Sequence, residues 1–225
     1  MNTRIAIDGL FVGQVARLAG DSRSSAIAKT AVSERCRLTA EGLVGDAQAD
    51  RRVHGGAGKA LHHYPAEHYA RLAAEFPDAH HLAPGGLGEN LSTHGLTEED
   101  VCIGDIFSIG SARIQVSQPR TPCWKIDHHA GCEGVAAFIA KHGLAGWYYR
   151  VLEAGDIAAG DRLEHIERSA TAVTLVEFWR VTSAQHPSIR TLCRLACASG
   201  LDANWVGKLM QRVEWLRNNG RGNEP

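Results

Sequence analysis

The sequence predicts a mostly β fold with added helices over residues 1–168, a small three-helix domain over residues 169–217 and a flexible tail over residues 218–225. Short apolar segments separated by glycines fill the first part, a pattern typical of strands and tight turns. Helix-capping residues recur after residue 170. The charge also changes there, because residues 1–168 hold 17 basic and 21 acidic residues whereas residues 169–225 hold 7 and 4. The change from strand-like to helical sequence pattern and the change in charge together indicate a domain boundary near Ser169.

Strands are expected where apolar residues alternate with polar ones or form short runs. The N-terminal candidates are residues 5–7, 10–12 and 15–18. Residues 25–32 alternate apolar and polar side chains, as a half-buried strand does. Residues 103–110 and 112–116 predict two strands joined by a Gly-Ser turn. Most of the 24 glycines lie in this part of the chain, at spacings that suit turns and barrel corners.

Two helices are expected to interrupt these strands. Residues 65–76 place His68 and apolar side chains along one face, and Pro65 is suited to the first turn. Residues 132–142 carry apolar side chains at helical spacing, and Gly143 is suited to end that helix.

Three further helices are expected after residue 170. Thr174 and Glu177 have capping-box spacing, in which each side chain binds a free N–H of the first turn. A second helix is predicted over residues 187–198, with its end at Gly200. Asp202 is suited to cap the third. Its apolar stripe would contain Trp205, Leu209, Val213 and Leu216.

Composition excludes several classes of protein. The 24 basic and 25 acidic residues among 225 give a formal charge of −1, whereas a bulk nucleic-acid binder needs a basic excess. No apolar run approaches the roughly 18 residues of a membrane helix, and residues 1–10 lack a signal-peptide core. We therefore expect a cytoplasmic protein without membrane or nucleic-acid partners. In that compartment the 6 cysteines, which form no CxxC motif, should be free thiols.

The 12 histidines do not predict a zinc site. The adjacent pairs at residues 62–63, 80–81 and 128–129 would diverge on a strand and lie about 100° apart on a helix. We expect them to be surface or half-buried residues, since no HxH or HExxH motif occurs. His54 differs, because Gly55 and Gly56 follow it and place an imidazole beside exposed backbone.

Cys123 is the cysteine whose surroundings suggest chemistry. It follows a proline-containing turn and is flanked by Arg120 and Lys125. Positive neighbours favour the thiolate, the form that attacks electrophiles or binds soft metals. Cys102, Cys132, Cys193 and Cys197 are expected to be buried, inert thiols, and Lys29 is expected to be a solvated residue near a strand end.

Glycine-rich clusters occur at residues 42–46, 53–56 and 85–91, and a fourth motif, SQPRTPCWK, occupies residues 117–125. Glycines let backbone N–H groups approach a ligand closely, and those donors suit anionic oxygens. None has the spacing of a familiar nucleotide-binding loop.

In their order along the chain these motifs resemble the MOSC domain (molybdenum cofactor sulfurase C-terminal domain). The resemblance rests on GLVGD at 42–46, HGG at 54–56, GENL at 88–91, GD at 104–105 and QPRTPC at 118–123. GWY at 146–148, GDI at 155–157 and GD at 160–161 are similar to the closing strand region of that family. Residues 5–168 are covered through motifs, and residues 170–216 through architecture alone.

The resemblance implies a compact β-barrel whose cleft holds a molybdopterin-type molybdenum cofactor, without pyridoxal phosphate. Cys123 would be the protein ligand of the metal. The residues implied to bind the cofactor are Lys29, His54, Asn90, Gln118, Arg120 and Thr121. Trp124 and Tyr148 would line the substrate side.

The implied reaction is two-electron reduction of an N–O bond, which converts hydroxylaminopurine-type base analogues or amidoximes into amines. A separate flavoprotein reductase is the implied electron donor, because the chain has no flavin or iron–sulfur signature. Two other functions stay open: a carrier of the cofactor or its sulfur without turnover, and a cofactor-free thiol enzyme that uses Cys123 and His54. For the helical domain, three roles stay open: shaping the cleft mouth, docking the reductase and supporting a homodimer.

Overall fold

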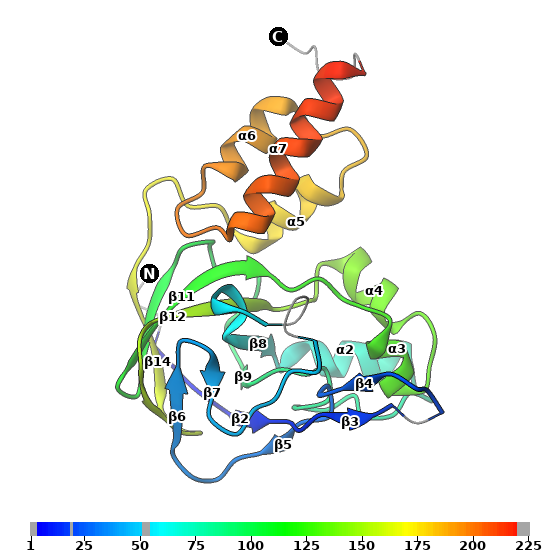
Figure 1. Cartoon of the computed structure of the whole chain (residues 1–225), viewed down its shortest axis with the longest axis vertical. Helices are drawn as coiled ribbons and strands as arrows, with labels where there is room; N and C mark the ends of the chain where they lie inside the picture. Colours follow the sequence, from blue (N-terminus) through cyan, green and yellow to red (C-terminus); the bar gives the residue numbers. More distant parts are fainter. Residues whose placement is uncertain (1–3, 19, 51–54, 220–225) are drawn as a thin grey trace.

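The computed structural model describes residues 4–18, 20–50 and 55–219 (Figure 1). Within them, a nine-stranded sheet has the order β1-β14-β10-β11-β12-β8-β9-β2-β5. Its strands are β1 (Arg4–Ala6), β2 (Gly9–Val12), β5 (Thr30–Ala31), β8 (Leu61–Pro65), β9 (Leu91–Thr93), β10 (Ile106–Ile109), β11 (Ala112–Pro119), β12 (Trp147–Glu153) and β14 (Arg162–Glu167). Only β8 and β9 pair in parallel among these described strands.

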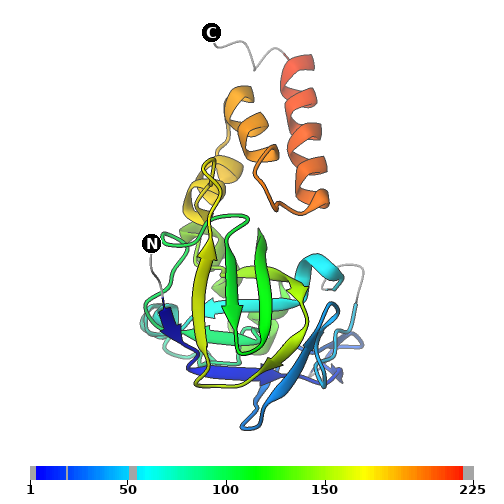
Figure 2. The same ribbon diagram turned by 90° about the vertical axis from the view of Figure 1, so that its left-hand side faces the viewer.

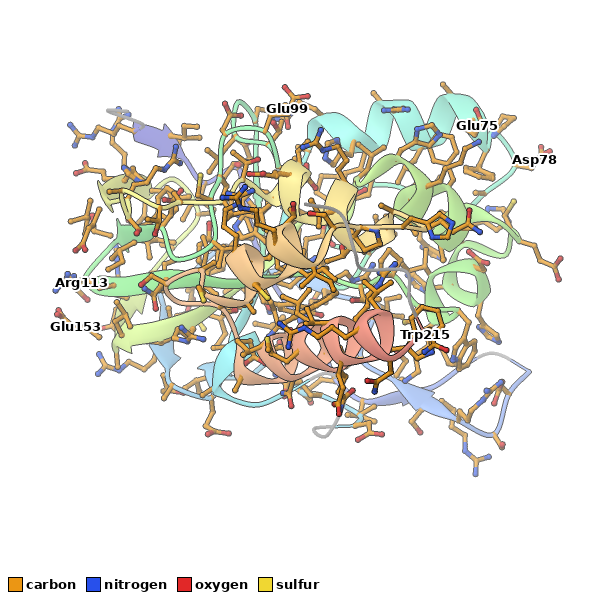
Figure 3. The ribbon with its side chains drawn as sticks, turned by 90° about the horizontal axis from the view of Figure 1, so that it is seen from above. Glu75, Asp78, Glu99, Arg113, Glu153 and Trp215 are labelled. Carbon is orange, nitrogen blue, oxygen red and sulfur yellow. The ribbon has the colours of Figure 1, made fainter. Side chains whose placement is uncertain are left out.

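Two small sheets flank the large one. The first joins β13 (Gly155–Ile157), β6 (Cys36–Thr39) and β7 (Gly42–Leu43), and the second pairs β3 (Ala16–Arg17) with β4 (Ser24–Ser25). The predicted hairpin of β10 and β11 is confirmed, with Ile109 opposite Ala112. Figure 3 shows Arg113 of β11 beside Glu153 of β12, where an exposed ion pair of 2.7 Å joins two register partners.

The large sheet is strongly curved, but the predicted closed barrel is not found. In Figure 2 the green and yellow strands β10, β11 and β14 stand upright side by side, with β10 antiparallel to its two neighbours, while the dark blue strand β2 crosses beneath them. Among the described residues, no pairing joins β1 to β5 at the two ends of the strand order. The short edge strands leave the sheet open, because the two residues of β5 pair only with β2.

The predicted strand over residues 25–32 is wrong. The chain forms β4 and β5 at its two ends, and residues 26–29 between them have no regular structure. The Lys29 backbone N–H donates to the Gly85 carbonyl (3.3 Å), so this segment is held by a loop rather than by a neighbouring strand. The irregular segment lines the pocket described below.

Helices cover one side of the β-rich part. They are α2 (Glu67–Glu75), α3 (Lys125–Ala130) and α4 (Val135–His142). A single apolar cluster, which includes Leu72, Ile126 and Ile139, packs them together. Gly143 ends α4 in the left-handed conformation, as expected (φ 67°). Pro65 does not begin α2, because it is the last residue of β8.

The three expected C-terminal helices are α5 (Leu175–Ser183), α6 (Ile189–Ala196) and α7 (Ala203–Asn218), which stack above the sheet in Figure 1. Thr174 caps α5 by accepting from the Glu177 N–H at 3.1 Å, but the Glu177 carboxylate binds Arg194 instead of completing the capping box. The second helix ends at Ala196 rather than Gly200. Asp202 caps α7, whose buried stripe contains Leu209, Val213 and Leu216.

The helices share one apolar core with the sheet. Phe107 and Trp147 of the sheet belong to the same buried cluster as Phe178 and Leu209 of the helices. The Ile103 N–H also donates to the Val173 carbonyl at 2.9 Å. The domain boundary near Ser169 stays a prediction, and most of the proposed tail, residues 220–225, lies outside the described residues. No helix in the described part of the chain is both long and apolar enough for a bilayer crossing.

Candidate active site

Loops from five parts of the chain meet at an open pocket, whose volume of about 600 Å³ includes open solvent. They are the segment between β4 and β5, the turn after β7, the loop before β9, the loop after β11 and the short 3₁₀ helix η1 (Ala57–Lys59). Strands β4, β8 and β12 and the first residue of α3 supply the remaining wall. The lining residues are Ser25, Ala26, Ile27, Lys29, Asp46, Ala47, Gln48, Ala49, Lys59, His62, Leu87, Gly88, Asn90, Arg120, Cys123, Lys125 and Tyr148.

A buried ion pair forms one side of this pocket. The Lys29 ammonium lies 2.6 Å and 2.8 Å from the two carboxylate oxygens of Asp46, and the side chains are only 6% and 5% exposed. Asn90 Nδ2 donates to Asp46 Oδ2 (2.9 Å), and the Gly13 N–H donates to Oδ1 (2.7 Å). Burial lowers the pKa of Lys29, while the charge of Asp46 acts in the opposite direction. Lys29 is therefore a buried residue of the pocket wall, and the expectation of a solvated strand end is wrong.

The loop before β9 is shaped by Glu89, which is completely buried. Its carboxylate accepts from Tyr69 Oη (2.5 Å), from the Gly85 N–H (2.5 Å) and from the Leu87 N–H (3.1 Å). Burial raises the pKa of Glu89, and these donors oppose the rise. Gly88, next to Glu89, has φ +82°, a conformation that favours glycine. The carboxylate thus fixes the loop that carries the pocket residues Leu87 and Gly88.

Arg120 is a second buried cation that lines the pocket, with 6% of its surface exposed. Its Nη2 donates to the Leu87 carbonyl (3.2 Å), which joins it to the glycine loop. Its Nη1 is buried and has no hydrogen-bond partner among the described residues. A buried donor without an acceptor costs roughly 1–3 kcal/mol, so this N–H suits an anionic ligand.

His62 and Tyr148 form a ring pair in the pocket wall, with centroids 5.1 Å apart. Burial lowers the pKa of His62 well below its usual value, and the charge of Arg120 acts in the same direction, so the ring is neutral at neutral pH. Burial raises the pKa of Tyr148, and the nearby Arg120 side chain opposes the rise. The Lys59 ammonium lies 5.9 Å from the Tyr148 ring centroid.

Cys123 lies in the loop between β11 and α3, half-buried, and lines the pocket. The Ile126 N–H donates to its carbonyl at 3.0 Å, so the cysteine immediately precedes the first turn of α3. Lys125 Nζ donates to the Ser24 carbonyl (3.0 Å), which ties this loop to β4. The structure brings Cys123 together with four other predicted residues: Lys29, Asn90, Arg120 and Tyr148.

Three of the remaining predicted residues do not line the pocket. Gln118 is buried and donates through Nε2 to the Gly58 carbonyl (3.1 Å), so it supports η1. Thr121 is exposed. Trp124 is 40% exposed, with the Arg23 guanidinium carbon 3.8 Å from its ring centroid. His54 lies outside the described residues.

The pocket residues that were not predicted as site residues include Asp46, Lys59 and His62. Asp46 ends the first glycine cluster, and a carboxylate there was a usable signal. The expectation that residues 62–63 lie near the surface is wrong, because both are buried in β8. Their predicted divergence is confirmed: His62 contacts the pocket, whereas the His63 ring nitrogens lie 3.0 Å from Tyr149 Oη and 2.9 Å from Thr93 Oγ1.

The histidine pairs at 80–81 and 128–129 are exposed or half-buried, as expected. Of the four cysteines expected to be buried, Cys102 is buried, Cys132 and Cys193 are half-buried and Cys197 is exposed. His80 and His81 are exposed, and the His81 ring stacks on half-buried His129 at 4.4 Å. All six cysteines are free thiols. No group of three or more His, Cys, Asp or Glu side chains in the described part of the chain is arranged to hold a metal ion.

Comparison with known proteins identifies the class. Residues 50–164 match the model of the MOSC domain. The chain is also 42% identical over 194 residues to Protein YiiM of Escherichia coli (strain K12), which covers 85% of this chain and 86% of YiiM. The chain therefore belongs to the MOSC-domain family.

Two further similarities extend the comparison. The crystal structure of YiiM from Escherichia coli has a TM-score of 0.79 and 32% identity, covering 99% of this chain and 96% of that one. A protein named "Reductase" from Gibberella moniliformis (strain M3125 / FGSC 7600) is 35% identical over 175 residues. That match covers 77% of this chain but 31% of the longer relative.

Proposed function

We propose that the chain is a molybdenum-cofactor-dependent reductase of N-hydroxylated compounds, such as hydroxylaminopurine-type base analogues and amidoximes. The observation that carries the proposal is Arg120, a buried guanidinium that lines the same pocket as Cys123 and has one N–H without a partner among the described residues. Membership of the MOSC-domain family supports a cofactor of this class.

The donor set of the pocket fits an anionic cofactor. The charged lining residues comprise four cations, Lys29, Lys59, Arg120 and Lys125, and one carboxylate, Asp46. Asp46 already binds Lys29, whereas one N–H of Arg120 has no partner within the part of the chain that the structure describes. Arg120 would therefore bind an anionic group of the cofactor, with the backbone of the Gly88 loop beside it. Cys123 would hold the metal through its thiolate, a soft ligand that suits molybdenum.

When bound, the cofactor would supply two-electron reduction with acceptance of an oxygen atom, chemistry that side chains do not provide. Overall, an N-hydroxylamine takes up two electrons and two protons and gives the amine and water. The protein's part is to bind and orient both molecules. His62 and Tyr148 would form the wall beside the substrate, because both rings line the pocket next to Arg120.

Electrons would come from a separate flavoprotein reductase. The similar protein named "Reductase" supports a redox function, although the matching region is less than a third of its length. A cytoplasmic location and a homodimer are compatible with this proposal and stay predictions.

The direct test is turnover of 6-N-hydroxylaminopurine by protein produced in a host that makes the cofactor, with a flavoprotein or chemical reductant. The expected product is adenine, formed in proportion to the molybdenum content. If molybdenum-loaded protein binds the cofactor but reduces no N-hydroxylated compound, the enzyme proposal fails, and a carrier of the cofactor or its sulfur becomes the better account. Thiol-dependent turnover without molybdenum would instead favour a cofactor-free enzyme.

A further inference from the structure

The C-terminal helices reach the candidate pocket through η1, the short turn that presents Lys59. Ser117 Oγ donates to the Gly58 carbonyl (2.5 Å), and Gln118 Nε2 donates to the same oxygen (3.1 Å). Ser117 Oγ also lies 3.0 Å from the Tyr148 carbonyl. These contacts join the turn to β11 and β12, and Lys59 follows directly as a lining residue of the pocket.

Asp202, the N-cap of α7, lies against the same turn. Its backbone N–H donates to the Ser117 carbonyl (2.9 Å), and its Oδ1 accepts from the Asn204 N–H (3.0 Å). A Cβ atom placed on Gly58 would overlap Asp202 Oδ2. The capping bond holds the carboxylate, so Asp202 cannot swing away from Gly58 without exposing the first turn of α7.

The charge of Asp202 also acts on Lys59. Burial lowers the pKa of Lys59, Asp202 opposes that shift, and Lys208 of α7 adds to it. The Lys59 ammonium in turn lies near the Tyr148 ring, in the wall beside the proposed substrate. The contact of Asp202 with Gly58 and the effect of its charge on Lys59 therefore both connect the start of α7 with the pocket.

We infer that Asp202 is a positioning residue of the pocket: by holding Gly58, the helical segment fixes how Lys59 enters the pocket, and so shapes its wall. The effect on substrate binding rests on the proposed function. The coupling between Asp202 and η1 is independent of the proposed function, and it can be measured without cofactor or substrate.

The coupling is tested by hydrogen exchange of the full chain at the Lys59 and Ala60 amides, which donate to Gly56 (2.8 Å) and Tyr149 (3.0 Å). We expect Gly58→Ala and Asp202→Ala each to accelerate this exchange about tenfold, because each loosens the turn. The double variant should exchange no faster than Asp202→Ala, because the added methyl group no longer meets a carboxylate. Independent effects that multiply to about a hundredfold would overturn the inference.

The matched control is Ser188→Ala, which removes the N-cap of α6, where Ser188 Oγ accepts from the Thr191 N–H at 3.2 Å. It should leave exchange at Lys59 and Ala60 unchanged, and an equal acceleration would mean that any loss of helix stability acts on the turn. If Asp202→Ala does not fold, Asp202→Asn serves instead, because asparagine also caps helices. Its exchange should stay close to wild type, since the contact with Gly58 is kept, and tenfold faster exchange would contradict the contact.

In molybdenum-loaded protein, Lys59→Gln and Asp202→Ala should raise KM for 6-N-hydroxylaminopurine about fivefold with kcat within about twofold, whereas Asp202→Asn should stay close to wild type. If wild-type protein reduces no N-hydroxylated compound, the proposed function fails and the exchange result stands. If the effects of Gly58→Ala and Asp202→Ala on hydrogen exchange multiply in the double variant, the inference fails whatever the activity.

Discussion

Lys29 and Asp46 form an ion pair of 2.6 Å that is almost completely removed from water, and Asn90 completes the coordination of the carboxylate. Breaking a buried pair leaves an uncompensated charge. We expect Asp46→Ala to lower the free energy of unfolding by about 3–5 kcal/mol, measured by urea denaturation. The double variant Lys29→Met/Asp46→Leu should lose less, because it leaves no buried charge.

The control for this prediction is the exposed pair of Arg4 and Glu164, whose side chains are 62% and 43% exposed. Glu164→Ala should change the free energy of unfolding by no more than about 1 kcal/mol. An Asp46→Ala variant as stable as Glu164→Ala would show that the buried pair contributes little.

Arg120 should matter more for cofactor retention than for folding. Arg120→Ala removes the unpartnered Nη1 and the bond to Leu87, so the fold loses one hydrogen bond, worth about 1 kcal/mol. We expect the molybdenum content of purified protein to fall at least about tenfold, the loss that one charge-assisted bond of 1.5–3 kcal/mol predicts. The melting temperature should fall by only a few degrees. Normal molybdenum content with a much lower melting temperature would reverse this assignment.

His63 should make the fold sensitive to acid. Burial lowers its pKa from 6.5 to about 3, so the unfolded chain binds the proton more readily than the folded chain between these values. The contribution to stability is therefore complete above about pH 6.5 and decreases as the pH falls toward 3. Between pH 6.5 and 5 the loss from this group is about 2 kcal/mol.

The measurement is the free energy of unfolding of His63→Gln and wild type at both pH values. The variant should lose less stability on acidification, because its amide takes up no proton. His186 is exposed, and His186→Gln should keep the wild-type pH dependence. Identical pH dependence of His63→Gln and wild type would contradict the assigned cause.

Local signals predicted the ends of several helices correctly. Thr174, Asp202 and Gly143 act within one turn of their own backbone, so their roles depend little on the rest of the fold. The β10–β11 hairpin could be predicted for the same reason. The role of Glu177 could not be predicted in this way, because its partner Arg194 lies on the next helix and the local sequence does not indicate a contact between helices.

The pocket wall was harder to predict, because its charged side chains are buried against residues that are distant in the sequence. Alternation over residues 25–32 suggested a strand, yet Lys29 turns inward to Asp46, 17 positions further along the chain. His62 and His63 were expected near the surface, since nothing in their local sequence shows that β8 lies between β9 and β12. Cys123 was singled out by its cationic neighbours, and the resemblance to the MOSC family added Arg120 as a cofactor-binding residue; both line one pocket.

The central claim is that Cys123 holds a molybdenum cofactor in this pocket. The most direct measurement is the molybdenum content per chain of wild type and Cys123→Ala, both purified from the same cofactor-competent host. Cys197→Ala serves as the control, since that thiol is exposed on the C-terminal helices. We predict molybdenum near one per chain in wild type and in the control, and little or none in Cys123→Ala. Full molybdenum binding by Cys123→Ala would contradict the account.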